Sequence, residues 1–215
     1  INLMSDNRAE NAVDGGVTDI INLIADNIST INMVTTVADA NDVYNGLTIT
    51  DEDDSNPAAM TINFGDAQND SVTVGVITLD SDTTSLTINN GDDDGTNNTT
   101  MNGVLAAGLT SLVVTDSYNL VDHSTTDTDY ETVIDLDDTV ALTSVDVTGA
   151  HGGVDLTIEA MADSATINLA NTDDVEADAN DELNITFSGD TGADDVVITG
   201  GAGEENIIIT NGDMD

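Results

Sequence analysis

The stretch Met60-Thr-Ile-Asn-Phe64 alternates large apolar residues with polar ones. The same alternation recurs in Ser85-Leu-Thr-Ile-Asn89, Asp155-Leu-Thr-Ile-Glu159, Ala165-Thr-Ile-Asn-Leu169 and Leu183-Asn-Ile-Thr-Phe187. Successive side chains of a β-strand point to opposite faces, so a period of two with many β-branched residues predicts half-buried strands. We therefore expect an all-β fold whose intervening Thr and Asn side chains face solvent.

Some of these runs also repeat one another. Leu109-Thr-Ser-Leu-Val-Val-Thr115 is echoed by Leu142-Thr-Ser-Val-Asp-Val-Thr148, and Thr84-Ser-Leu-Thr-Ile88 is a shorter version. Short strands that recur at nearly regular spacing are typical of a sandwich, a barrel or a β-solenoid. We predict a β-solenoid of the parallel β-helix or β-roll type with loop insertions. A β-sandwich is the alternative, because alternation alone does not separate the two folds.

The beginning of the chain has a different pattern. Residues 17–37 are richer in Ile, Leu and Ala, and their apolar positions mix helical with strand spacing. This segment can form either a short helix or a pair of β-rungs. We therefore divide the chain into an N-terminal segment, residues 1–45, and a β-rich domain, residues 46–215. A further boundary is expected between Asn102 and Gly108.

The charge of the chain is its most unusual property. The 215 residues include 43 acidic side chains and one basic one, Arg8, so the formal net charge is −42. Self-repulsion opposes a compact state unless cations or salt screen it. High net charge is also typical of disorder, but 39% of the residues are hydrophobic and they are placed in a regular pattern. We therefore expect a folded chain in cation-rich surroundings, which include the high salt of a halophilic source.

Composition also bears on which chemistry to expect. The absence of Cys excludes disulfides and thiolate metal sites, and no apolar run reaches the length of a membrane span. Nucleic acid is not expected as a partner, because phosphate binding needs Lys and Arg. The two histidines, His123 and His151, lie in polar surroundings, and neither G-x-S-x-G nor H-E-x-x-H occurs. We therefore expect no enzymatic activity.

A metal-binding pattern lies near the C-terminal end. Gly189-Asp-Thr-Gly-Ala-Asp-Asp-Val-Val197 is followed by Gly200-Gly-Ala-Gly-Glu-Glu-Asn-Ile-Ile208. Both approach the calcium β-roll repeat G-G-x-G-x-D-x-U-x, in which U is a large aliphatic residue. Glycines let the backbone turn so that carbonyl oxygens point inward, and carboxylates complete an oxygen cage that suits Ca²⁺. The expected ligand residues are Gly189, Asp190, Gly192, Asp194, Asp195, Gly201, Gly203, Glu205 and Asn206.

A second candidate loop is Asn90-Gly-Asp-Asp-Asp-Gly-Thr96. Asn90, Asp92 and Asp94 match the first half of an EF-hand loop, but position twelve would be Met101 instead of Glu. We therefore expect a Ca²⁺ loop between strands, with a solvated acidic turn as the alternative. The acidic runs at residues 51–54 and at Asp135, Asp137 and Asp138 are candidates of the same kind.

The two glycine-rich segments, within residues 188–211, resemble the calcium β-roll of RTX (repeats-in-toxin) proteins. The wider chain, with the phrase Leu-Thr-Ser-Val-Asp-Val-Thr-Gly at residues 142–149 and no Lys or Cys, resembles bacterial RTX-type surface-layer proteins. The repeats start at Gly189 and Gly200, 11 residues apart instead of nine, which favours isolated calcium loops. The resemblance implies secretion to the cell surface, Ca²⁺-dependent folding and assembly into a lattice of identical chains.

Two other functions share these features. The chain can be the calcium-binding repeat region of a secreted adhesin, with a cell-surface glycan as its partner. It can also be the non-catalytic RTX region of a secreted hydrolase.

Overall fold

The structure is a computed structural model. It describes residues 2–5, 17–18, 21–24, 28–35, 42–50, 58–65, 72–90, 99–116, 131–150, 153–169, 183–188, 195–200 and 205–209. These residues form strands, turns and short connections, with no helix among them.

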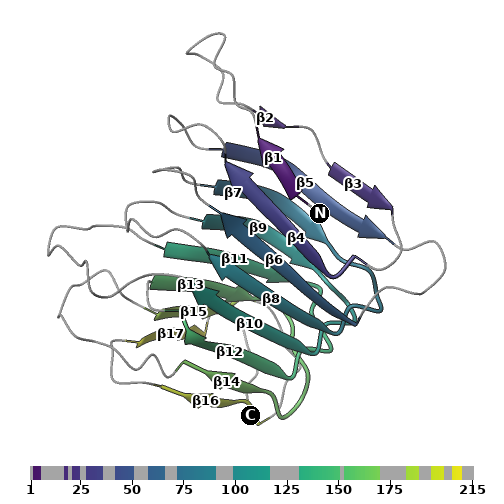
Figure 1. Cartoon of the computed structure of the whole chain (residues 1–215). Helices are drawn as coiled ribbons and strands as arrows, with labels where there is room; N and C mark the ends of the chain where they lie inside the picture. Colours follow the sequence, from purple (N-terminus) through teal and green to yellow (C-terminus); the bar gives the residue numbers. More distant parts are fainter. Residues whose placement is uncertain are drawn as a thin grey trace, which may run out of the picture.

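The strands lie in two parallel sheets (Figure 1). Sheet A has eight strands, in the spatial order β1 (Asn2–Ser5), β4 (Thr30–Thr35), β6 (Ala59–Gly65), β8 (Ser85–Asn90), β10 (Ser111–Asp116), β12 (Ser144–Gly149), β14 (Thr166–Asn168) and β16 (Val197–Thr199). Sheet B has nine, which are β17 (Glu205–Ile209), β15 (Leu183–Phe187), β13 (Gly153–Ile158), β11 (Glu131–Asp137), β9 (Thr99–Leu105), β7 (Val72–Thr78), β5 (Asp42–Thr50), β2 (Val17–Thr18) and β3 (Ile21–Ile24), with β3 also paired to β5.

From β4 onward the chain crosses to the other sheet after every strand, and every strand pair is parallel. The chain is therefore wound as a coil. One turn brings a residue beside its counterpart 22 to 34 positions later, as in the pairs Ser144 and Thr166, and Thr115 and Gly149. The predicted β-solenoid is confirmed, and the parallel winding separates it from a sandwich of antiparallel hairpins.

The repeated phrases of the sequence are neighbours in space. Ser85 pairs with Ser111, and Ser111 pairs with Ser144, so the three related runs form adjacent strands of sheet A. Each repeat is therefore one half-turn of the solenoid, in line with the stacked units of repeat architectures.

The N-terminal region contributes strands to the same sheets. The described residues between 17 and 37 belong to β2, β3 and β4, apart from Ile28 and Ser29 just before β4, which corresponds to β-rungs and not to a helix. The position proposed as the main boundary, near Gly46, lies within β5, which pairs with both β3 and β7. Asn102 likewise lies within β9, which pairs with β7 and β11.

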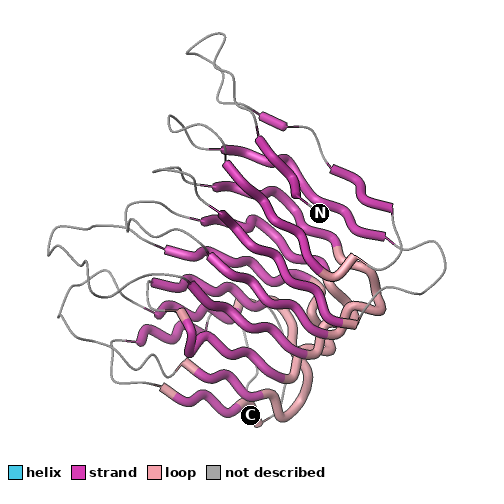
Figure 2. Tube along the Cα trace, viewed as in Figure 1, coloured by secondary structure: helices cyan, strands magenta, loops and turns pink. Residues whose placement is uncertain are grey.

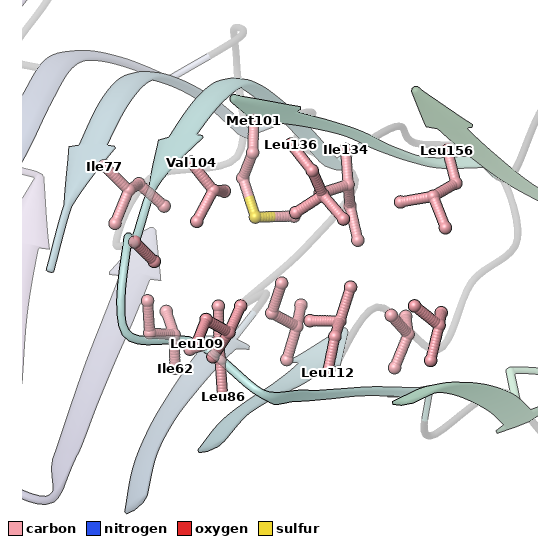
Figure 3. Packing of buried hydrophobic residues seen from close by; sticks show 14 of the residues in the cluster. Ile62, Ile77, Leu86, Met101, Val104, Leu109, Leu112, Ile134, Leu136 and Leu156 are labelled. Carbon is pink, nitrogen blue, oxygen red and sulfur yellow. The ribbon is translucent and has the colours of Figure 1, made fainter. Parts of the chain in front are cut away.

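Buried Ile, Leu, Val and Met side chains fill most of the space between the sheets (Figure 3), and three aromatic side chains, Tyr44, Phe64 and Phe187, complete the core. Ile134 and Leu156 point inward from sheet B toward side chains such as Leu86 and Leu112 of sheet A, and all four are fully buried. The core cluster runs from Ile28 to Phe187. Burial of each such side chain is worth about 1.5–3 kcal/mol, so repeated aliphatic layers can hold a chain with few aromatics.

The turns that lead from β7 to β8, from β9 to β10, from β11 to β12 and from β13 to β14 are short and stack on one another along one edge, drawn pink in Figure 2. The Thr110 hydroxyl donates to the Thr84 carbonyl at 2.9 Å, and the Thr143 hydroxyl donates to the Thr110 carbonyl at 3.0 Å. Successive turns are thus tied together by side chains as well as by the sheets.

Candidate functional site

The outer face of sheet B carries carboxylates. Asp135 on β11 and Asp155 on β13 alternate with buried residues and so point outward. Burial raises the pKa of Asp135 above its ordinary value of 3.8, and the nearby charges of Asp137 and Glu159 raise it further. Burial also raises the pKa of Asp155. The charged forms of these groups are therefore disfavoured by the fold.

A glycine makes room for this acidic surface. A Cβ at Gly103 would lie 2.9 Å from Asp137 Oδ2, so the missing side chain on β9 accommodates the carboxylate of the next strand. The sequence singled out Asp135 and Asp137 but missed Asp155 and Glu159. Asp155 and Glu159 come one turn later. The sequence feature that could have identified Asp155 is its outward position in the alternating run at 155–159.

Among the residues that the structure describes, no three His, Cys, Asp or Glu side chains are grouped so that they could hold a metal ion. Most of the residues expected to bind calcium are not among those that the structure describes. Gly189, Asp190, Gly192, Asp194, Gly201 and Gly203 of the C-terminal repeats, Asp92 and Asp94 of the second loop and the acidic run at 51–54 fall outside the described residues.

The described ends of the C-terminal repeats show where these segments lie in the chain path. Asp195 is exposed with φ 63°, two residues before β16. Glu205 and Asn206 begin β17 and pair with Leu183 and Asn184 of β15. Because β16 belongs to sheet A and β17 to sheet B, the second glycine-rich segment connects the two sheets.

Asn90 is placed differently from its expected role at a loop surface. Its side chain is buried at the end of β8, where Nδ2 donates to Thr132 Oγ1 at 3.0 Å. Its Oδ1 accepts a 3.1 Å hydrogen bond from Thr99 Oγ1. The amide thus links sheet A to two neighbouring strands of sheet B, which is a structural use of this side chain.

The outer face of sheet A is uncharged over its first described turns. Every described outward side chain on β4, β6, β8 and β10 is Ser, Thr, Asn, Ala or Val. They are Thr30, Asn32, Ala59, Thr61, Asn63, Ser85, Thr87, Asn89, Ser111, Val113 and Thr115. We call this set the sheet A face.

Hydrogen bonds along the solenoid axis order the sheet A face. Asn63 Nδ2 donates to Asn32 Oδ1 and Asn89 Nδ2 donates to Asn63 Oδ1, each at 2.6 Å. Thr115 Oγ1 continues the row by donating to Asn89 Oδ1. The first described carboxylate beyond it is Asp146 on β12, which accepts from the backbone N–H and the hydroxyl of Thr148.

The comparisons with protein-family models, curated proteins and solved structures found no match for this chain. The described part of the chain also holds no helix long and apolar enough to cross a membrane.

Proposed function

We propose that this chain is a structural, self-assembling segment of an extracellular surface protein, either a surface layer or a surface filament, stabilised by Ca²⁺. The observation that carries the proposal is the single hydrophobic core that continues from Ile28 to Phe187 between two stacked parallel sheets. A solenoid of this kind builds an extended body with two long outer faces, because each turn contacts mainly its neighbours.

The role of Ca²⁺ follows from charge. A net charge of −42 with a single basic residue leaves almost every carboxylate without a cationic partner. Asp135 shows the consequence, since burial and neighbouring acids raise its pKa. Oxygen-rich loops of the Gly-Asp type can bind Ca²⁺ in the folded state only, and such binding stabilises that state by mass action.

Thermal unfolding followed by circular dichroism, at low ionic strength, tests this role. We expect Ca²⁺ at 100 times its Kd to add about 2.7 kcal/mol of stability relative to EGTA, which is about 5–10 °C in Tm for a chain of this size. The control is NaCl at the same ionic strength. Equal Tm values with Ca²⁺ and with EGTA would contradict calcium dependence, and equal stabilisation by NaCl would assign the acidity to adaptation to salt.

A binding role in an adhesin is the second candidate, and the uncharged sheet A face favours it. Such a face can lie flat against a neutral surface such as a glycan. Electron microscopy of the purified chain with Ca²⁺ separates the two functions. Ordered arrays or filaments support the structural proposal, whereas isolated rods that bind glycan support the adhesin.

A further inference from the structure

We propose that the solenoid consists of two cooperative units, and that removal of cations unfolds the second unit while the first stays folded. The first unit comprises the strands up to β10, and the second comprises β11 to β17. This inference rests on the proposed stabilisation by cations and names the part of the fold that the cations control. The device is a cation-dependent step of sub-global unfolding.

Both sheets change register at the junction of the two units. In sheet B the register between β9 and β11 shifts by one residue between Ile134 and Leu136. In sheet A the register between β10 and β12 shifts by one residue between Val113 and Thr115. All other strand pairs that the structure describes keep one register from end to end. Because an extra residue interrupts the hydrogen-bond ladder, the junction is the place where neighbouring turns are least tightly joined.

The row of side-chain hydrogen bonds on sheet A also stops at this junction. It runs from Asn32 to Thr115, and Thr115 pairs with Gly149, which has no side chain to extend it. A Cβ at Gly149 would lie 2.7 Å from Thr115 Cγ2, so the shifted register leaves no room for one. Besides the ladders, the turn before β12 and the buried Asn90 amide still link the two units.

Charge differs across the junction on both outer faces. Every outward side chain that the structure describes on β3 to β10 is uncharged, on sheet A and sheet B alike. Carboxylates then project from β11, β12 and β13 and follow the end of β13, and we call this set the acidic band: Asp135, Asp137, Asp146, Asp155 and Glu159. The described residues include no Lys, Arg or His, so no described side chain neutralises the acidic band.

The cost of this charge falls on the second unit. Asp135 faces uncharged residues of β9, but Asp137 shares its strand, and Asp155 and Glu159 come from the β13 side. Burial, and then the charges of Asp137 and Glu159, raise the pKa of Asp135, so its ionisation at neutral pH opposes folding. Each turn of a solenoid contacts mainly its neighbours, so this cost is local and the uncharged first unit does not share it.

Hydrogen exchange of the full chain, followed by mass spectrometry of its peptides, tests the division. At low ionic strength in EGTA, we expect amides of β11, β13 and β15 to exchange at least about tenfold faster than in Ca²⁺. Amides of β6, β7 and β8 should change by less than about threefold. The measurement in Ca²⁺ is the reference for any fraying that does not depend on cations.

Two pairs of substitutions remove two charges from one unit or the other. Asp135→Asn with Asp155→Asn acts on the acidic band, and Asp80→Asn with Asp82→Asn acts on the turn between β7 and β8. An amide oxygen at position 80 can still accept the backbone N–H of residue 82, as the Asp80 carboxylate does. In EGTA we expect the first pair to slow exchange of β11, β13 and β15 about twofold to fivefold, and the second pair to change it by less than about 1.5-fold. Equal slowing by both pairs would overturn the inference, because total charge would then set the effect.

The outcomes also separate this inference from the proposed role of calcium. Loss of protection in EGTA that is uniform along the chain and reversed by Ca²⁺ contradicts the two units, although calcium dependence stands. Loss confined to the second unit that NaCl reverses as well as Ca²⁺ supports the two units and contradicts a specific role for calcium. If EGTA at low ionic strength changes no strand, both proposals fail.

Discussion

Asn63 donates a 2.6 Å hydrogen bond from its side-chain amide to Oδ1 of Asn32, which lies 31 residues earlier in the chain and on the neighbouring strand. The Asn63 Oδ1 in turn accepts from Asn89 Nδ2, so one residue links three successive strands of sheet A. Asparagine suits this position because its amide offers both donors and an acceptor. The row supplements the backbone ladder with bonds between turns.

The first prediction tests this row. Asn63→Ala removes two side-chain hydrogen bonds and leaves one amide donor of Asn89 and one acceptor of Asn32 to find water. We expect a loss of about 1–2 kcal/mol in the free energy of unfolding, measured by denaturant titration. Asn102→Ala, at an exposed position on β9, is the control and should change stability by less than about 0.5 kcal/mol. Equal effects of the two substitutions would contradict a stabilising role for the side-chain hydrogen bonds that join Asn32, Asn63 and Asn89.

The second prediction concerns a tight approach between two turns. A Cβ at Gly108 would lie 1.9 Å from the carbonyl oxygen of Ser81 in the preceding stacked turn. Backbone cannot yield as a flexible side chain does, so Gly108→Ala should cost about 2–3 kcal/mol or prevent folding. The adjacent Ala107 is exposed, and Ala107→Ser should leave Tm within about 1–2 °C of the wild-type value. An unchanged Tm for Gly108→Ala would show that the turns do not stack so closely.

The third prediction separates structural from calcium-binding residues in the segment that starts at Asn90. Asn90→Ala removes the partner of the Thr99 and Thr132 hydroxyls inside the solenoid. We expect a loss of about 1–3 kcal/mol that is the same with Ca²⁺ and with EGTA. Asp92→Asn and Asp94→Asn test the loop itself, and they should lower stability only when Ca²⁺ is present. A calcium-dependent loss in Asn90→Ala would instead make this amide a ligand.

The fourth prediction follows from the pKa values of Asp135 and Asp155, which the fold raises above the ordinary 3.8. A carboxyl whose pKa is raised in the folded state binds its proton more tightly there than in the unfolded state. In cation-free buffer at neutral pH, such a carboxyl is fully charged and lowers the free energy of unfolding by its full amount. That effect disappears as the pH falls through the raised pKa toward 3.8. These two groups therefore make the chain more stable on mild acidification, as measured by Tm between pH 7 and pH 4.

The variant that tests this pH dependence is Asp135→Asn. After allowance for solvent screening we expect about 0.5 kcal/mol of added stability at pH 7, which is about 1–2 °C in Tm, and a smaller gain on acidification. Asp82→Asn, on an exposed turn, removes the same charge and is the control. If both variants raise Tm equally, total charge and not the position of Asp135 sets the effect.

Local pattern was sufficient to predict much of the fold. Alternation in runs such as Met60 to Phe64 predicted strands, because strand geometry places successive side chains on opposite faces. The repeat of the Thr-Ser phrase predicted stacked units, and Ser111 and Ser144 are indeed lateral neighbours. The segment at residues 17–37 was ambiguous. Its mixed spacing fits either period, and pairing with β5 and β6 decides it in favour of strands.

The candidate site was less predictable. The composition of loops rich in Gly and Asp predicts Ca²⁺ binding from the sequence alone, since glycine permits the turn and carboxylates suit Ca²⁺. The sequence could not place Asn90, because an Asn at a strand end is equally suited to a loop or to a buried hydrogen bond. Its role follows from Thr99 and Thr132, which come near it only when the solenoid is wound.

The sequence by itself determined that this is a strand-forming, acidic chain, since strand periodicity and net charge are properties of the residues alone. Only the tertiary structure decided which polar residues share a face. Thr87 and Thr100 occupy equivalent places in the alternating pattern, yet they lie on opposite sheets. Which polar side chains meet on each outer face depends on how the turns bring strands 22 to 34 residues apart into register, and local alternation carries no information about that register.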